Sequence, residues 1–171
     1  MKMSVKKSVG LSIFSFTSML TTLLPAQAQE FQSLGNAIKT ILGNAGKGAF
    51  KKTLGPGQDV YYSKNEHGKA ARLAFIETGI YKPNCTHTWV VGVDPATSKV
   101  TGIEVVEMSC PHAFPTKEKS YLDQYVGKGP AEARSLIKQI DTIAKATGSC
   151  NLTTEAVVRS ISSASKVKGT F

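Results

Sequence analysis

Apolar and polar residues alternate through the middle of the chain, and this period of two predicts a series of β-strands. Residues 60–63 and 71–78 are separated by the polar sequence KNEHGK, an arrangement typical of a β-hairpin. Residues 86–93 and 100–108 are rich in β-branched side chains and flank a second turn, which has Pro95 at its second position. Together the four segments predict an antiparallel β-meander.

Three segments outside this region have apolar residues at helical spacing. The first contains Leu34, Ile38, Ile41 and Leu42. Residues 130–148 begin with Pro130 and end at Gly148, which suits a C-terminal cap, and residues 153–164 begin at Thr153, an expected N-cap. The predicted class is α+β, a single domain in which a meander of about four strands has helices packed on one face.

The first residues have the features of a secretory signal peptide. Three lysines precede an apolar run at residues 11–24, and the small residues Ala26 and Ala28 mark a cleavage site. The run is too short to span a bilayer comfortably. We therefore expect a signal peptide at residues 1–28, an N-terminal helical segment at residues 29–53 and a domain at residues 54–171. This predicts a periplasmic or secreted protein with no transmembrane span in the mature chain.

The charge of the chain excludes one class of partner. The formal net charge is +9, but three of the lysines lie in the signal peptide and the other basic residues are scattered. No stripe of arginines interleaved with aromatic residues is present, so we expect no nucleic-acid partner. Trp89 shares the strand face of Val91 and Val93, which predicts a core position. Nothing in the sequence around Tyr81 indicates that it belongs to a functional site.

Two matched Cys-x-His pairs carry most of the reactive side chains. Cys85 and His87 form one pair, Cys110 and His112 form the other, and Cys150 is the third cysteine. In a strand, residues i and i+2 point to the same face, so the two pairs could form a Cys₂His₂ site for zinc or copper. Three alternatives remain for these side chains: a metal or haem ligand set, free thiols, or a disulfide joining Cys110 to Cys150 or to Cys85.

Several segments between residues 54 and 161 resemble the FMN-binding domain family in their order and spacing. Residues 79–109, GIYKPNCTHTWVVGVDPATSKVTGIEVVEMS, are similar to a family run that leads from Gly-Tyr-Gly to Val-Gly-Ile-Asp. YLDQYVGK at residues 121–128 and TTEAVVRSI at residues 153–161 resemble two later family segments. The resemblance implies an exported flavin-carrying module that transfers electrons to a redox partner protein, a carrier more readily than a stand-alone enzyme.

The family signature, Asp-x-x-Ser/Thr-Gly-Ala-Thr-x-Thr-Ser, is degraded in this chain. Counting back from TTEAVV places Asn151 at the threonine that can carry FMN, and an amide cannot form that phosphoester. Counting forward from Asp141 places Thr147 there instead. We prefer the first alignment, which predicts non-covalent flavin. Its phosphate is expected at a helix start, with cofactor contacts from Thr147, Gly148, Ser149, Asn151, Thr153 and Thr154.

The resemblance also implies that the cysteines converge. Cys110 and His112 stand where family members often carry Glu-Thr-Pro-Gly beside the flavin ring, and Cys150 lies inside the degraded signature. This places Cys110 and His112 among the expected cofactor contacts and predicts a disulfide between Cys110 and Cys150. The alternative function is a flavin-free binding protein of the same fold, with a Cys/His metal or haem site at Cys85, His87, Cys110 and His112, or with a protein partner.

Overall fold

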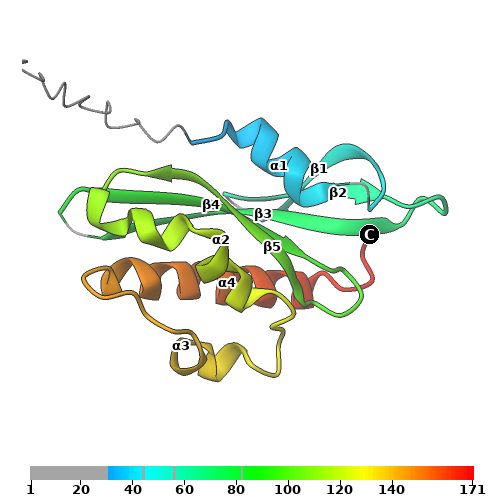
Figure 1. Ribbon diagram of the computed structural model, residues 1–171. Coiled ribbons are helices and arrows are strands. Elements are labelled where there is room, and N and C mark those ends of the chain that lie inside the picture. Colours follow the sequence, from blue (N-terminus) through cyan, green and yellow to red (C-terminus); the bar gives the residue numbers. More distant parts are fainter. Residues whose placement is uncertain (1–30, 44, 56, 82) are drawn as a thin grey trace, which may run out of the picture.

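One antiparallel sheet runs through the computed structural model, which describes residues 31–43, 45–55, 57–81 and 83–171. Its strands follow one another in chain order (Figure 1): β1 (Lys47–Gly55), β2 (Gln58–Lys64), β3 (Ala70–Tyr81), β4 (Cys85–Val93) and β5 (Val100–Met108). The expected α+β class, single domain and antiparallel meander are confirmed. The sheet has one strand more than the four that the alternation predicted.

The additional strand is β1, which lies in the segment that we expected to be helical. Its side chains are mostly exposed, so its sequence carries no alternation of apolar and polar residues. Pairing with β2 holds it in place, and the ring centroids of Phe50 and Tyr62 lie 5.5 Å apart across the two strands. Because the side chains of β1 contribute little to the core, the period-two pattern misses this strand.

Helices cover both faces of the sheet (Figure 1), whereas the sequence predicted helices on one face only. The helix α1 (Leu34–Leu42) lies on one face, and the long helix α4 (Thr147–Lys166) lies on the other. Successive residues of β3 divide between two hydrophobic clusters, with Leu73 and Phe75 in the cluster beneath α4 and Ala74 in the cluster beneath α1. The alternation along β3 therefore reflects burial on both faces.

The cluster beneath α4 is the larger one and contains Trp89, which is fully buried as predicted. Short helices between β5 and α4 close one side of it: η1 (Pro111–Lys117), α2 (Lys119–Leu122), η2 (Asp123–Tyr125), η3 (Ala133–Ser135) and α3 (Leu136–Gln139). The hydroxyls of Tyr121 and Tyr125 lie 2.7 Å apart in the interior, and Tyr125 also bonds to Thr154 of α4 at 2.8 Å.

The continuous helix expected at residues 130–148 is not formed. Only the short helices η3 and α3 occur there, and Ile140 already has an extended backbone. Lys145 then adopts a left-handed conformation with φ of 66°, which turns the chain into α4. Gly148 consequently lies in the first turn of α4 and does not cap a preceding helix.

The last helix begins six residues earlier than its sequence predicted. Thr153 is not its N-cap, because α4 starts at Thr147 and Ala146 occupies the cap position. The hydroxyl of Thr153 donates to the carbonyl of Ser149 at 2.9 Å, one turn back along the helix. A threonine can satisfy its hydroxyl in this way inside a helix, so a hydroxyl residue alone does not mark the helix start.

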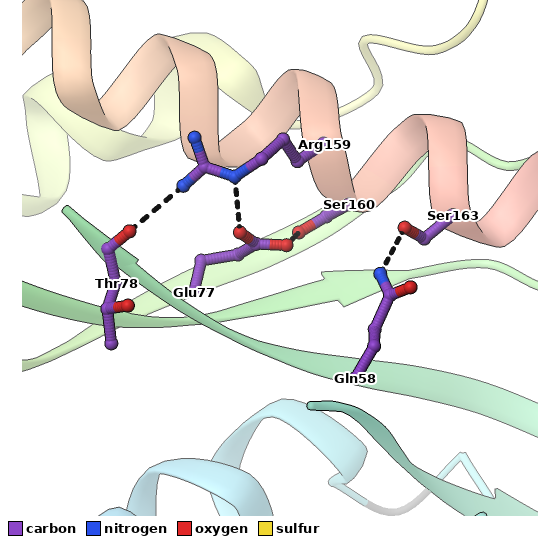
Figure 2. A network of polar contacts seen from close by, with 6 residues as sticks. All are labelled: Gln58, Glu77, Thr78, Arg159, Ser160 and Ser163. Carbon is purple, nitrogen blue, oxygen red and sulfur yellow. Dashed lines mark hydrogen bonds and ion pairs between the residues drawn. The ribbon is translucent and has the colours of Figure 1, made fainter. Parts of the chain in front are cut away.

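A polar network fixes α4 against the sheet (Figure 2). Glu77 of β3 is 8% exposed and accepts hydrogen bonds from Arg159 Nε at 2.7 Å and from Ser160 Oγ at 3.2 Å. Farther along the helix, the Gln58 amide donates to Ser163 Oγ at 2.5 Å. These directional contacts specify which residues of α4 face the sheet, and so help to set where its first turn lies.

Candidate functional site at the first turn of α4

A disulfide joins the two Cys-x-His segments. Cys85 is the first residue of β4 and Cys110 follows β5, and their Cα atoms lie 5.3 Å apart. Because β4 and β5 are adjacent strands, their pairing brings these ends together. The predicted bridge from Cys110 to Cys150 is therefore wrong. Cys150 is a buried free thiol whose sulfur accepts a hydrogen bond from the backbone N–H of Ile143 at 3.4 Å.

A pocket of about 470 Å³ opens beside this disulfide, and we name it the α4 pocket. Its volume lies in the range of small-molecule sites. Three separate parts of the chain line it: residues 81 and 83–85, residues 109–113, and residues 145, 146, 148 and 149. Segments around both Cys-x-His pairs and the degraded signature thus meet in one place, although only some of the expected side chains line the pocket.

Four of the expected cofactor residues line the α4 pocket, namely Cys110, His112, Gly148 and Ser149. Thr147 is exposed at the start of α4, next to this lining. Asn151, Thr153 and Thr154 lie farther along the helix and are not part of it. Thr153 is fully buried, and the Thr154 hydroxyl is used by Tyr125 and the Cys150 carbonyl. These two threonines therefore do not offer donors to a ligand in the pocket.

The first turn of α4 makes this wall of the pocket electropositive. The first backbone hydrogen bond of the helix runs from Cys150 N to Ala146 O at 3.0 Å, and no side chain caps the helix. The preceding N–H groups carry the positive end of the helix dipole. Lys145 and His112 also line the pocket, and no Asp or Glu is found among its described lining residues. This arrangement favours an anion or an electron-rich group.

His87 supports this wall from behind. It is fully buried, with Nε2 3.0 Å from Ser149 Oγ and Nδ1 3.2 Å from the Cys85 carbonyl. A carbonyl only accepts, so Nδ1 carries the hydrogen, and Ser149 donates to Nε2. Burial lowers the pKa of His87 below its usual value and favours this neutral form. His87 therefore positions Ser149 and the start of β4.

The alternative metal set is not formed in this disulfide state. The sulfurs of Cys85 and Cys110 are bonded to each other, and both ring nitrogens of His87 have partners within the protein. Within the part of the chain that the structure describes, no three His, Cys, Asp or Glu side chains are grouped so that they could hold a metal ion. The metal site was suggested because residues i and i+2 of a strand share a face. That pattern does not reveal that the two sulfurs lie close enough to bond.

Tyr81 is one of the pocket residues that the sequence interpretation missed. It ends β3, is 54% exposed and lies across the first turn of α4. A Cβ atom on Gly148 would overlap Cε2 of the ring and lie 2.7 Å from Cδ2 and 2.8 Å from Cζ. Glycine is therefore required for this close approach. Lys145 was also missed, because a lysine gives no indication of the positive φ that directs the chain into α4.

A larger hollow of about 750 Å³ lies elsewhere, among α1, β5 and α2. Charged side chains of both signs line it, namely Arg72, Lys117, Lys119, Glu104 and Asp123. Lys119 donates to both carboxylate oxygens of Asp123 at 2.6 and 2.8 Å, and Glu104 accepts a hydrogen bond from Gln32. Burial raises the pKa of Glu104 above its usual value. Carboxylates thus line this hollow, whereas the described lining residues of the α4 pocket include no Asp or Glu.

Comparison with known proteins adds no relative. No protein-family model, curated protein or solved structure matches the chain. Among the described residues, no helix combines the length and apolar character needed to cross a membrane.

Proposed function

We propose that this protein is an exported electron-transfer module that binds FMN non-covalently in the α4 pocket. The observation that carries the proposal is the meeting of Cys110, His112, Gly148 and Ser149 in one pocket at an uncapped helix start. From the resemblance to the FMN-binding domain family, we expect the segments that contain these residues to lie at the flavin. When bound, FMN supplies one- and two-electron chemistry, whereas the protein supplies binding and orientation.

The residues of the pocket fit the two chemical ends of FMN. The phosphate is dianionic near neutral pH and suits the free amides of the first turn of α4, with Lys145 as a cation beside them. The exposed ring of Tyr81 offers an aromatic face to the flavin ring. The Cys85–Cys110 disulfide is compatible with an oxidising compartment, which supports a periplasmic or secreted location. A separate redox partner protein would receive or supply the electrons.

The start of α4 bears on which residue faces the phosphate. The alignment that we preferred places the acceptor at Asn151, but this residue lies one turn inside the helix, whereas Thr147 begins it. Only the first turn has free amides. We therefore expect Thr147→Val to weaken FMN binding by about twofold to tenfold through the loss of one hydrogen bond to an anion. Asn151→Ala serves as the matched control, with no change in affinity.

The test is a fluorescence titration of the purified mature chain with FMN, together with its absorption spectrum and intact mass. The proposal expects a flavin absorption band or saturable binding of added FMN, with no covalent adduct. A flavin-phosphate mass on Thr147 would refute the non-covalent part only. Colourless protein that also fails to bind added FMN would refute the proposal and favour the flavin-free alternative of the same fold.

A further inference from the structure

The Cys85–Cys110 disulfide can be reached from solvent on one side. Cys85 is 4% exposed, whereas Cys110 is half-buried and lies in the loop between β5 and η1. Both residues line the α4 pocket, which is large enough to admit a side chain from another molecule. An attacking thiolate would therefore meet the sulfur of Cys110, and the sulfur of Cys85 would be the leaving group.

The surroundings of this disulfide favour thiolates. It shares the pocket with the uncapped first turn of α4, with Lys145 and with His112, and no carboxylate is found among the described lining residues. Helix N-termini and neighbouring cations lower the pKa of a cysteine thiol, and a leaving thiol of lower pKa leaves faster. A positive pocket also attracts an anionic attacker.

The fold holds the two segments together without the disulfide. The Thr86 N–H donates to Ser109 Oγ at 2.7 Å, and the Ser109 N–H donates to the Thr86 carbonyl at 3.0 Å. Cys85 is also paired with Tyr81 in the ladder between β3 and β4. The bond between the sulfurs can therefore open while β4 and the end of β5 remain in register.

We propose that Cys85–Cys110 is a redox-active disulfide that exchanges with the dithiol of a partner protein. The partner's first thiolate attacks Cys110, so a mixed disulfide forms, the Cys85–Cys110 bond breaks and Cys85 leaves as a thiolate. The partner's second thiolate then attacks the partner's first sulfur, which is bonded to Cys110 in the mixed disulfide, and Cys110 is released as a thiolate. The partner is oxidised to a disulfide, and Cys85 and Cys110 are reduced and take up two protons. This activity requires no flavin.

The experiment mixes flavin-free oxidised protein with an equimolar amount of reduced thioredoxin as the dithiol probe. Thiols are then alkylated, and the reduced fraction is measured by intact mass and peptide mapping. We expect an equilibrium constant of at least about 10 for the exchange that reduces Cys85 and Cys110 and oxidises thioredoxin. Catalytic disulfides have such values, whereas structural disulfides resist reduction. Cys150→Ala removes the buried thiol as a source of rearrangement, and the wild-type chain is mapped in parallel. An equilibrium that leaves most of the disulfide intact overturns the proposal.

A charge variant tests the role of the pocket. Asn tolerates left-handed backbone, so Lys145→Asn removes the charge while keeping the turn. We expect its exchange with thioredoxin to be slower by about twofold to fivefold, the effect of one screened charge near a helix end. Lys168→Asn, an exposed lysine outside the pocket, is the matched control and should match the wild-type rate. Equal rates in all three proteins would contradict the positive-pocket argument. The double variant of Cys85→Ala and Cys110→Ala should keep the wild-type circular dichroism spectrum, and its unfolding would indicate a structural bond instead.

Discussion

Replacing Arg159 by Ala tests the network that docks α4 on the sheet. The substitution removes the hydrogen bond from Arg159 Nε to Glu77 at 2.7 Å and the one from its terminal nitrogen to the Thr78 carbonyl at 3.1 Å. Glu77 then retains the hydroxyl of Ser160 at 3.2 Å as its side-chain partner. The carboxylate remains largely shielded from water, because its side chain is 10% exposed. A charge left in this position destabilises the folded state.

The magnitude follows from how deeply each partner lies. An exposed ion pair contributes about 0–1 kcal/mol, whereas removing one partner of a buried pair costs about 3–5 kcal/mol. The carboxylate of Glu77 is nearly buried, but the Arg159 side chain is 46% exposed. We therefore expect Arg159→Ala to lower the free energy of unfolding by about 2–3 kcal/mol, between these limits. Glu77→Gln removes the charge and should cost less, about 1–2 kcal/mol.

Urea unfolding followed by tryptophan fluorescence measures these changes. Trp89 is the one tryptophan of the chain and is fully buried beneath α4, so its emission reports the loss of this core. The two single variants and the double variant form a cycle, and we expect a coupling energy of about 1–2 kcal/mol. Lys166→Ala, a change at an exposed position of the same helix, should alter the free energy of unfolding by less than about 0.5 kcal/mol.

Strict additivity of the two single variants would refute this reasoning, since it would mean that Glu77 and Arg159 do not interact in the folded protein. A coupling that disappears in about 1 M salt would also contradict it, because screening acts mainly on pairs in which both charges are exposed.

Two other substitutions test the α4 pocket. Gly148→Ala should weaken FMN binding, because the added Cβ displaces the Tyr81 ring. Thermal unfolding should show little destabilisation, because alanine favours the helix by up to about 1 kcal/mol. Gly35→Ala, with open space around it, is the control for titration and unfolding. Burial lowers the pKa of His87, so its neutral form stabilises the fold fully above the reference pKa of 6.5, and this contribution is lost as the pH falls through that value toward the folded pKa. Urea unfolding from pH 8 to pH 5 should therefore show a smaller decline for His87→Gln than for the wild type, and equal declines would contradict this assignment.

The sequence was most informative where burial imposes a period. The strands β2 to β5 could be predicted because their side chains alternate between two environments, as Leu73 and Ala74 do on β3. β1 could not, because its side chains are mostly exposed and have no such constraint. The helix expected at residues 130–148 failed for a related reason. Leu136 and Ile140 are both buried, as a helix would place them, but short helical turns and an extended segment bury them equally well.

The candidate site was predicted in part, and its errors have a physical origin. The resemblance placed the segment of Cys110 and the start of the last helix together, and both line the α4 pocket. It wrongly implied Cys150 as the partner of Cys110. The choice of Cys85 depends on strand register and on which way one helical side chain points, and the resemblance carries neither. Tyr81 was overlooked because its role comes from Gly148, a residue sixty-seven positions away that leaves room for the ring.

Where α4 begins decides which residues can meet an anion, whatever motif the sequence preserves. A hydroxyl residue inside the helix, such as Thr153, finds a carbonyl one turn back, and its backbone N–H is already part of the helical ladder. A residue of the first turn, such as Ser149, has no such partner for its N–H, and its hydroxyl is held by His87. The degraded signature and an anion-binding helix start are therefore compatible. Because α4 begins six residues earlier than expected, its free amides lie at the pocket of the Cys85–Cys110 disulfide and not at the preserved TTEAVV segment. The proposed phosphate and the proposed leaving thiolate would both meet these amides there.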